Sequence, residues 1–228
     1  VLSIGYEYEV SGDPLSVYEQ LRQINPSPHM FFFKFGSRVV MGASPELLID
    51  VEGSAIRHRG TLAGTIRRGK DADEDMMLAQ KLLGDEKEKA EHMMLVDLAR
   101  NDMGRICTFG SIAVKDLLHV KKFSHVQHLS SEIRGILNEK ENAFTALSAC
   151  FPAGTLSGAP KIEAMKIIHK LEGVPRGPYG GVGGYFSLNG SSMQCINIRS
   201  FAVSGTRGFM QAGSGIVADS DPESEYQE

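Results

Sequence analysis

The chain has 228 residues, of which 42% are hydrophobic and 23% charged, and its formal net charge is −4. This is ordinary globular composition, with enough chain for one large domain or two small ones around a sizeable core. The mixed charges contain no basic tract typical of nucleic-acid binding, the three scattered cysteines favour neither a disulfide framework nor a zinc site, and no apolar run approaches the ~18 residues of a membrane span.

The N-terminal residues predict a strand, a helix and a second strand. Tyrosines and glutamates alternate along Val1–Val10, which indicates an edge strand. Apolar residues recur at helical spacing over Pro14–Ile24, and the prolines of Asn25–Pro28 end this helix. Met30–Phe35 is so uniformly apolar that we expect a buried strand.

Two further strands are expected at Arg38–Met41 and Glu46–Val51, joined by Gly-Ala-Ser-Pro into an antiparallel meander. The next segment, Gly60–Lys70, is rich in glycine and basic residues. A solvated loop is the ordinary interpretation. An anion-binding loop is the alternative, because Gly64 and Thr65 could offer backbone and hydroxyl donors.

An amphipathic helix at Asp71–Leu83 leads into a second helix at Asp85–Asp102, for which Asp85 suits the N-cap position. Glu88 and Glu91 share one face of this helix with an otherwise apolar stripe. Two interpretations stay open. The carboxylates either cap the helix and lie at its edge in water, or bind a hard cation, since half-buried carboxylates need a partner.

Strand-like runs fill Ile112–Ile136 and contain two histidines, His125 and His128. At a spacing of three they would face opposite sides of a strand, so they form no obvious metal pair. A lone histidine is more often a structural residue than a catalyst. A short helix is expected at Ala143–Cys150.

Two glycine-rich segments follow. The first, Phe151–Lys161, fails the P-loop count because three residues separate its glycines, but it leads into a helix at Pro160–Leu171 whose N-terminus favours an anion. The second, Arg176–Tyr185, lacks the dinucleotide fingerprint. Its glycines instead suit close approach of a backbone or ligand.

The C-terminal region predicts more strands. Asn189-Gly190 is a hairpin signal that would pair Phe186–Leu188 with Cys195–Val203. Arg199 would then lie mid-strand among apolar neighbours, where a basic side chain needs an acidic partner from the protein or a ligand. Met210–Val217 is the last strand expected.

Paired carboxylates occur twice, because Glu225 and Glu228 repeat the spacing of Glu88 and Glu91. With an inward arginine, a candidate histidine and the glycine-rich segments, they suit a small acidic substrate held with Mg²⁺. No Ser-His-Asp, Cys-His or HExxH arrangement stands out.

Eight motifs carry a resemblance to a known family. The chain resembles the chorismate-utilising enzymes, and among them most closely the large subunit, component I, of anthranilate synthase. The motifs follow the order in that family and are SPELL at 44–48, LAGT at 62–65, AEHMMLVDLARNDMGR at 90–105, FSHVQHL at 123–129, FPAGTLSGAPK at 151–161, RGPYGGVGGYF at 176–186, INIRS at 196–200 and AGSGIVADSDPESEYQE at 212–228.

The resemblance implies roles for the candidate residues. Glu91 and Glu228 would bind Mg²⁺, with Glu88 and Glu225 beside the metal and a glutamate acting as general acid to a departing hydroxyl. His128 would assist the elimination of pyruvate. The implied substrate contacts are Gly64, Thr65, Thr155, Tyr179, Arg199, Gly213, Ser214 and Gly215, of which Tyr179 and Arg199 would bind the enolpyruvyl carboxylate.

The implied reaction forms anthranilate and pyruvate from chorismate, the first step of tryptophan biosynthesis. Ammonia adds at ring carbon 2 as the 4-hydroxyl leaves, and pyruvate is then eliminated as the ring becomes aromatic. Ammonia would come from a glutamine amidotransferase subunit, component II, because no Cys-His glutaminase pattern occurs here. Pro28, His29 and Met30 resemble part of a tryptophan feedback site, although His29 replaces the usual tyrosine.

The fold implied is α+β, with antiparallel β-sheets packed face to face and helices outside, an α/β/β/α sandwich in a single domain over residues 1–228. The alternatives are an aminodeoxychorismate, isochorismate or salicylate synthase, or a non-catalytic chorismate-binding module. LAGT and FPAGTLSGAPK favour anthranilate synthase over its aminodeoxychorismate relative. We also expect a fragment lacking an N-terminal region and a C-terminal helix, from a cytoplasmic protein without nucleic-acid or membrane partners.

Overall fold

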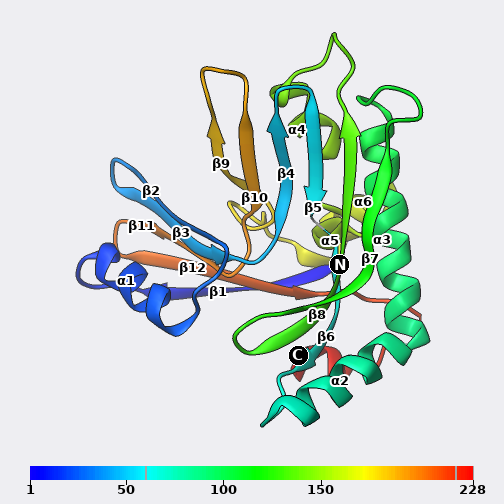
Figure 1. The fold of residues 1–228 in the computed structure, drawn as a ribbon. Coiled ribbons are helices and arrows are strands. Elements are labelled where there is room, and N and C mark those ends of the chain that lie inside the picture. Colours follow the sequence, from blue (N-terminus) through cyan, green and yellow to red (C-terminus); the bar gives the residue numbers. More distant parts are fainter. Residues whose placement is uncertain (60, 219, 228) are drawn as a thin grey trace. The chain divides into compact units, whose positions relative to one another are not determined.

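The computed structural model describes residues 1–59, 61–218 and 220–227, which form two antiparallel β-sheets and the helices around them (Figure 1). The predicted α+β class with antiparallel sheets is therefore confirmed. The chain divides into two compact units. One contains residues 1–45, 155–183 and the chain from Cys195 onward, and the other contains residues 46–154 and 184–194.

The first unit is built on a five-stranded sheet with strand order β1-β12-β11-β3-β2. Its strands are β1 (Leu2–Glu9), β2 (His29–Phe35), β3 (Arg38–Ser44), β11 (Ser200–Ser204) and β12 (Arg207–Ser214). Its helices are α1 (Pro14–Ile24), α6 (Lys161–Glu172) and α7 (Pro222–Gln227). The short helix α5 (Gly154–Ser157) begins in the other unit.

Helix α1 forms as its sequence predicts. Pro14 occupies the first turn, and the Asp13 side chain accepts a hydrogen bond from the Leu15 N–H at 3.0 Å. Tyr18 packs on a buried cluster formed by Val39, Met41 and Val203. The helix thus covers part of one face of the sheet.

The predicted edge strand is confirmed by β1, whereas the predicted burial of Met30–Phe35 is wrong. In β2 only Phe31 is buried, and Phe35 is 69% exposed. The strand pairs with β3 alone and lies at the edge of its sheet, so its far end is open to solvent. Apolar composition predicted a strand correctly but could not distinguish an edge from a centre.

The predicted meander is also wrong, because its two strands belong to different sheets. Strand β3 ends at Ser44, Pro45 follows without an N–H to donate, and β4 starts at Leu47 in the other sheet. The hairpin signal at Asn189-Gly190 is confirmed. The strands it joins are Val182–Phe186 and Ser192–Ile196, earlier than predicted.

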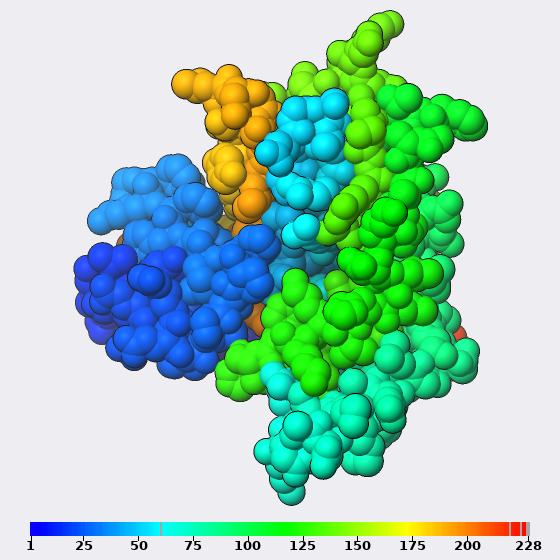
Figure 2. Space-filling view, viewed as in Figure 1, coloured from blue at the N-terminus to red at the C-terminus, as the bar shows by residue number. Residues whose placement is uncertain are grey.

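The second unit is built on a seven-stranded sheet with order β6-β8-β5-β4-β10-β9, and β7 pairs with β8. Its strands are β4 (Leu47–Glu52), β5 (Ala55–Arg59), β6 (Leu62–Arg67), β7 (Ala113–Lys122), β8 (Val126–Ile136), β9 (Val182–Phe186) and β10 (Ser192–Ile196). Its helices are α2 (Ala72–Gly84), α3 (Glu86–Gly104) and α4 (Ala143–Cys150), each within about a turn of its predicted bounds. In Figure 2, α2 and the β7–β8 hairpin form neighbouring surfaces.

Two further predictions are corrected here. The loop expected at Gly60–Lys70 is largely strand β6, which pairs with β8. Cys195–Val203 is two strands, because the chain leaves one sheet at Ile196 and joins the other at Ser200. None of the helices in the described ranges has the length and apolar character needed to cross a bilayer.

Candidate functional site

Gly64 lies next to three predicted site residues of the second unit, Thr65, Glu88 and His128. Strands β6 and β8 pair with Thr65 opposite His128. Nδ1 of His128 lies 3.1 Å from the Gly64 carbonyl oxygen and 3.1 Å from the Thr65 hydroxyl oxygen. The other side of Gly64 faces helix α3 at Glu88. His128, held by Thr65, thus lies at the carbonyl oxygen of Gly64, and Glu88 lies on the other side of this glycine.

The backbone at Gly64 requires glycine for two reasons. Its φ is +69°, at an irregularity in the pairing of β6 with β8. A Cβ at this position would lie 3.0 Å from Glu88 Oε2 and 3.1 Å from Leu82 Cδ1. A side chain here would therefore press on the carboxylate of Glu88.

The contacts of His128 determine its tautomer. A carbonyl oxygen only accepts hydrogen bonds, so the bond to Gly64 places the proton on Nδ1. In the neutral ring, Nε2 then carries the lone pair and is the basic nitrogen. His128 is buried, and its ring stacks edge-on against Phe123 with centroids 5.4 Å apart. His125 is exposed at the hairpin, so the two histidines do separate.

Helix α3 presents the first carboxylate pair as the sequence predicts. Asp85 Oδ1 accepts hydrogen bonds from the N–H groups of Lys87 and Glu88, at 3.0 and 3.1 Å, which confirms it as the N-cap. Glu88 and Glu91 are both half-buried. Their hard oxygen donors fit the chemistry of Mg²⁺. Within the described ranges no group of three or more His, Cys, Asp or Glu side chains is placed to hold a metal, and Glu228 lies outside those ranges.

A buried hydrogen bond connects α3 to β8 at His92, the residue after Glu91. Nε2 of His92 lies 2.7 Å from Ser131 Oγ, and Ser131 Oγ accepts the Leu118 N–H at 3.1 Å. Nδ1 of His92 is buried and has no hydrogen-bond partner among the residues that the structure describes. Burial lowers the pKa of His92 to about 4, so the ring is neutral at neutral pH.

The motifs did not single out His92 or Ser131. Helical spacing alone would have placed His92 on the buried stripe with Val96, Ala99 and Met103. Its partner lies 39 residues further along the chain, and no local pattern predicts such a contact.

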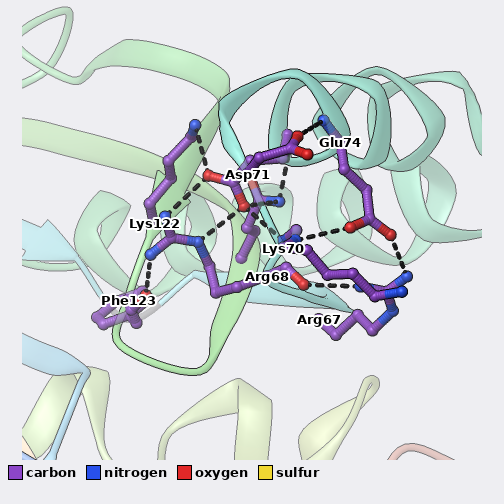
Figure 3. Close-up of polar contacts among 10 residues, drawn as sticks. Arg67, Arg68, Lys70, Asp71, Glu74, Lys122 and Phe123 are labelled. Carbon is purple, nitrogen blue, oxygen red and sulfur yellow. Dashed lines mark hydrogen bonds and ion pairs between the residues drawn. The ribbon is translucent and has the colours of Figure 1, made fainter.

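A second cluster anchors α2 to the β-strands of this unit around the buried carboxylate of Asp75. Figure 3 shows Arg67, Arg68, Glu74 and Lys122 of this cluster. Arg68 donates two hydrogen bonds to Asp75, at 2.9 and 2.8 Å, and Lys122 donates one at 2.8 Å. Hydrogen bonding by Arg68, and then by Lys122, holds the pKa of Asp75 well below its usual range. Arg67 is paired with Glu74 at 2.5 Å. These arginines of the predicted anion-binding segment are thus bound to carboxylates of α2.

In the first unit, Tyr179 lies beside Gly213. A Cβ on Gly213 would lie 3.1 Å from the Tyr179 hydroxyl oxygen and 2.5 Å from the Leu2 carbonyl oxygen. Tyr179 is buried, and the guanidinium of Arg176 lies 5.8 Å from its ring centroid. Two predicted substrate contacts are therefore neighbours, although the sequence separates them by more than thirty residues.

Both oxygens of the Glu225 carboxylate accept hydrogen bonds from hydroxyl groups. Ser214 donates to Oε2, and Ser220 donates to Oε1 at 2.7 Å. Ser220 Oγ in turn accepts the Val217 N–H at 3.1 Å, which orients its proton toward the glutamate. The second carboxylate pair thus has an anchored member, and Gly215 follows Ser214 directly beyond the end of β12.

Arg199 does not lie in a strand as predicted. It occupies the connection between β10 and β11, where its φ is +49° and its carbonyl oxygen accepts the Ala43 N–H at 3.1 Å. A left-handed backbone at a residue other than glycine is a strained feature often found at functional sites. Thr155 begins the part of α5 that belongs to this unit, and Pro28, His29 and Met30 lead into and open β2.

Comparison with known proteins identifies the family. The whole chain, residues 1–228, matches the family described as chorismate binding enzyme. It is 54% identical to anthranilate synthase component 1 of Methanothermobacter thermautotrophicus, over 100% of this chain and 49% of that protein. The crystal structure of anthranilate synthase component I from Streptococcus pneumoniae gives a TM-score of 0.91 at 44% identity, over 99% of this chain and 50% of that one.

A more distant relative is MenF, the menaquinone-specific isochorismate synthase of Escherichia coli. It gives a TM-score of 0.88 at 29% identity, over 99% of this chain and 52% of that one. The chain thus spans about half the length of these relatives. Since the family match extends over every residue, the chain belongs to the chorismate binding enzymes.

Proposed function

We propose that the protein is the component I subunit of an anthranilate synthase, a lyase that forms anthranilate and pyruvate from chorismate and ammonia. The observation that carries the proposal is the arrangement around Gly64 in the second unit, with His128, held by Thr65, at its carbonyl oxygen and Glu88 on its other side. Relatives about half identical to this chain bear the name anthranilate synthase component 1, which supports the same assignment.

We assign His128 as the base of the second step. With Nδ1 held by Gly64 and Thr65, Nε2 would act as the basic nitrogen. It would remove the proton from ring carbon 2 as the pyruvate leaves, so that the ring becomes aromatic. Glu88 would donate a proton to the departing 4-hydroxyl in the first step, which leaves as water.

The carboxylates of Glu91 and Glu228 would hold Mg²⁺, with Glu88 and Glu225 beside them. When bound, the metal would orient the ring carboxylate of chorismate and stabilise charge that develops there. Tyr179 and Arg199 would bind the enolpyruvyl carboxylate, and Thr155 with the backbone at Gly213–Gly215 would complete the contacts.

We also propose a partner subunit and a place in metabolism. Ammonia would come from a glutamine amidotransferase subunit, and the reaction would begin tryptophan biosynthesis in the cytoplasm. Pro28, His29 and Met30 would belong to a tryptophan effector site at the start of β2.

The test is product identification. The full-length protein is incubated with chorismate, ammonium and Mg²⁺, and products are separated by chromatography with fluorescence and mass detection. Fluorescent anthranilate with one pyruvate per turnover supports the proposal. Isochorismate in its place would assign the protein to the activity named for the Escherichia coli relative, and a folded protein that binds chorismate without turnover would make it a binding module.

A further inference from the structure

The bond between His92 and Ser131 joins the two elements that carry the proposed chemistry. His92 follows Glu91 on α3, and Ser131 lies three residues beyond His128 on β8. Both side chains are buried, with His92 0% and Ser131 2% exposed. The bond is short, at 2.7 Å.

The position of α3 on β8 determines where its carboxylates lie relative to His128. Gln127 and Ser131 bond to α2 and α3, respectively, so this face of β8 is the one that the helices cover. His128 alternates with Gln127 along the strand and therefore points to the opposite face. The spacing between the acidic helix and His128 then depends on how α3 is held across the strand.

Packing alone does not account for a histidine at position 92. Its Nδ1 is buried and finds no partner in the described part of the chain, and an apolar ring of similar size would avoid that loss. Ser131 Oγ also accepts a hydrogen bond from the Leu118 N–H. Leu118 has φ +56° and lies at a bulge in β7. The serine is thus oriented by the strand on one side and engages the helix on the other.

We propose that His92 and Ser131 are positioning residues, which set the rotation and height of α3 so that Glu88 and Glu91 reach their working positions relative to His128. This inference rests on the proposed function, because it concerns residues assigned there to metal and proton transfer. Neither residue touches the substrate in this account.

The experiment compares single variants of the full-length protein, together with Glu91→Gln alone and combined with His92→Phe. His92→Phe fills the space but removes the bond, His92→Gln keeps an amide near the place of Nε2, and Ser131→Ala removes the hydroxyl. Ser192→Ala is the matched control, since Ser192 is also a buried strand serine with two hydrogen bonds, to Tyr185 O and from Gln194. Readouts are the Mn²⁺ dissociation constant by electron paramagnetic resonance, kcat/KM for chorismate, and the thermal midpoint.

His92→Phe and Ser131→Ala should each weaken Mn²⁺ binding and lower kcat/KM by roughly tenfold or more, as loss of an outer support typically does. His92→Gln should restore most of both. Ser192→Ala should lower the thermal midpoint and leave Mn²⁺ binding unchanged. In a Glu91→Gln background, His92→Phe should weaken Mn²⁺ binding little further, because the effect acts through Glu91.

Two results would overturn the inference in distinguishable ways. If Glu91→Gln weakens Mn²⁺ binding but His92→Phe and Ser131→Ala behave like Ser192→Ala, the positioning role fails and the proposed function stands. If Glu91→Gln leaves Mn²⁺ binding unchanged, the metal site of the proposed function fails, and the positioning role falls with it.

Discussion

At the scale of the residue, Gly64 sets how closely a strand can approach the acidic helix. Its φ is positive, and a Cβ added to it would lie 3.0 Å from a carboxylate oxygen of Glu88. Its carbonyl oxygen fixes the ring of His128. The sequence predicted Gly64 as a substrate contact through its backbone. The structure adds a steric reason for glycine that the sequence could not contain, because Glu88 is 24 positions away.

Gly64→Ala should therefore be more damaging than a glycine substitution at a positive φ alone. The backbone strain should cost about 1 kcal/mol of unfolding free energy, and the contact with Glu88 should add about as much. Gly53→Ala is the control, since its φ is +59° and no atom of the described residues lies within 4 Å of the added Cβ. Urea unfolding measures both variants. Equal losses of unfolding free energy in the two variants would show that the Glu88 side chain moves aside at no energetic cost.

Three residues show which features the sequence could predict and which it could not. Asp85 was predicted as the N-cap because capping is local. Arg199 was misplaced in a strand, because the transfer of the chain between two sheets at Asn197–Arg199 leaves no mark on the apolar pattern. His92 was missed because its partner is remote in sequence.

At the scale of the element, α2 is attached to the strands through one carboxylate. The Asp75 carboxylate accepts hydrogen bonds from Arg68 at the end of β6 and from Lys122 of β7. It also accepts one from the side-chain amide of Gln127 of β8, at 3.2 Å. The same interactions hold the pKa of Asp75 below its usual range. The segment that the sequence predicted as a loop is thus a strand because α2 and β8 both bind it.

The Asp75 pKa gives a pH-dependent prediction. A carboxyl whose pKa is lower in the folded state contributes stability above its unfolded pKa, near 3.9, and loses it as pH falls toward the folded value. Asp75→Asn should therefore destabilise the protein strongly at pH 7, and the difference from wild type should shrink as pH drops below about 4. Urea midpoints across this range measure it. Asp97→Asn is the control, since Asp97 lies in an exposed pair with Arg100, and it should change the urea midpoint little at any pH. If the loss of stability in Asp75→Asn stayed constant from pH 7 to 3, the charge of Asp75 would be ruled out as its cause.

Helix α7 supplies a second element-scale prediction. It bears Glu225, whose carboxylate is bound by Ser214 at the end of β12 and by Ser220 before the helix. Ser220→Ala should lower the free energy of opening this segment by about 1 kcal/mol. Hydrogen exchange over residues 220–227 measures it, with Ser37→Ala in the β2–β3 turn as the control. Unchanged exchange would mean that Ser214 alone anchors Glu225.

Elements with local signals were predicted well, and those defined by neighbours were not. The helix α4 matches its predicted bounds, Ala143–Cys150, because a capping box at Asn142 and Thr145 begins it. The strand β2 was predicted, but its burial was not, since edge position depends on which strands pair across the sheet.

At the scale of the whole molecule, the chain supplies proposed site residues from both compact units. Glu88, Glu91 and His128 belong to the unit formed by residues 46–154 and 184–194, whereas Tyr179, Arg199 and Glu225 belong to the other. The motifs predicted both sets, because each motif is short and complete in itself. How each set is built, through Gly64 in one unit and the Ser214–Glu225–Ser220 contacts in the other, required the structure.

The most direct test of this account is a Mg²⁺ titration of anthranilate formation by the wild type and Glu91→Gln. The wild type should show saturable activation by Mg²⁺. Glu91→Gln should need at least about tenfold more metal or lose turnover. Glu86→Gln, which changes an exposed glutamate of the same helix, should behave as wild type. A Glu91→Gln titration that superimposes on that of the wild type would contradict the account.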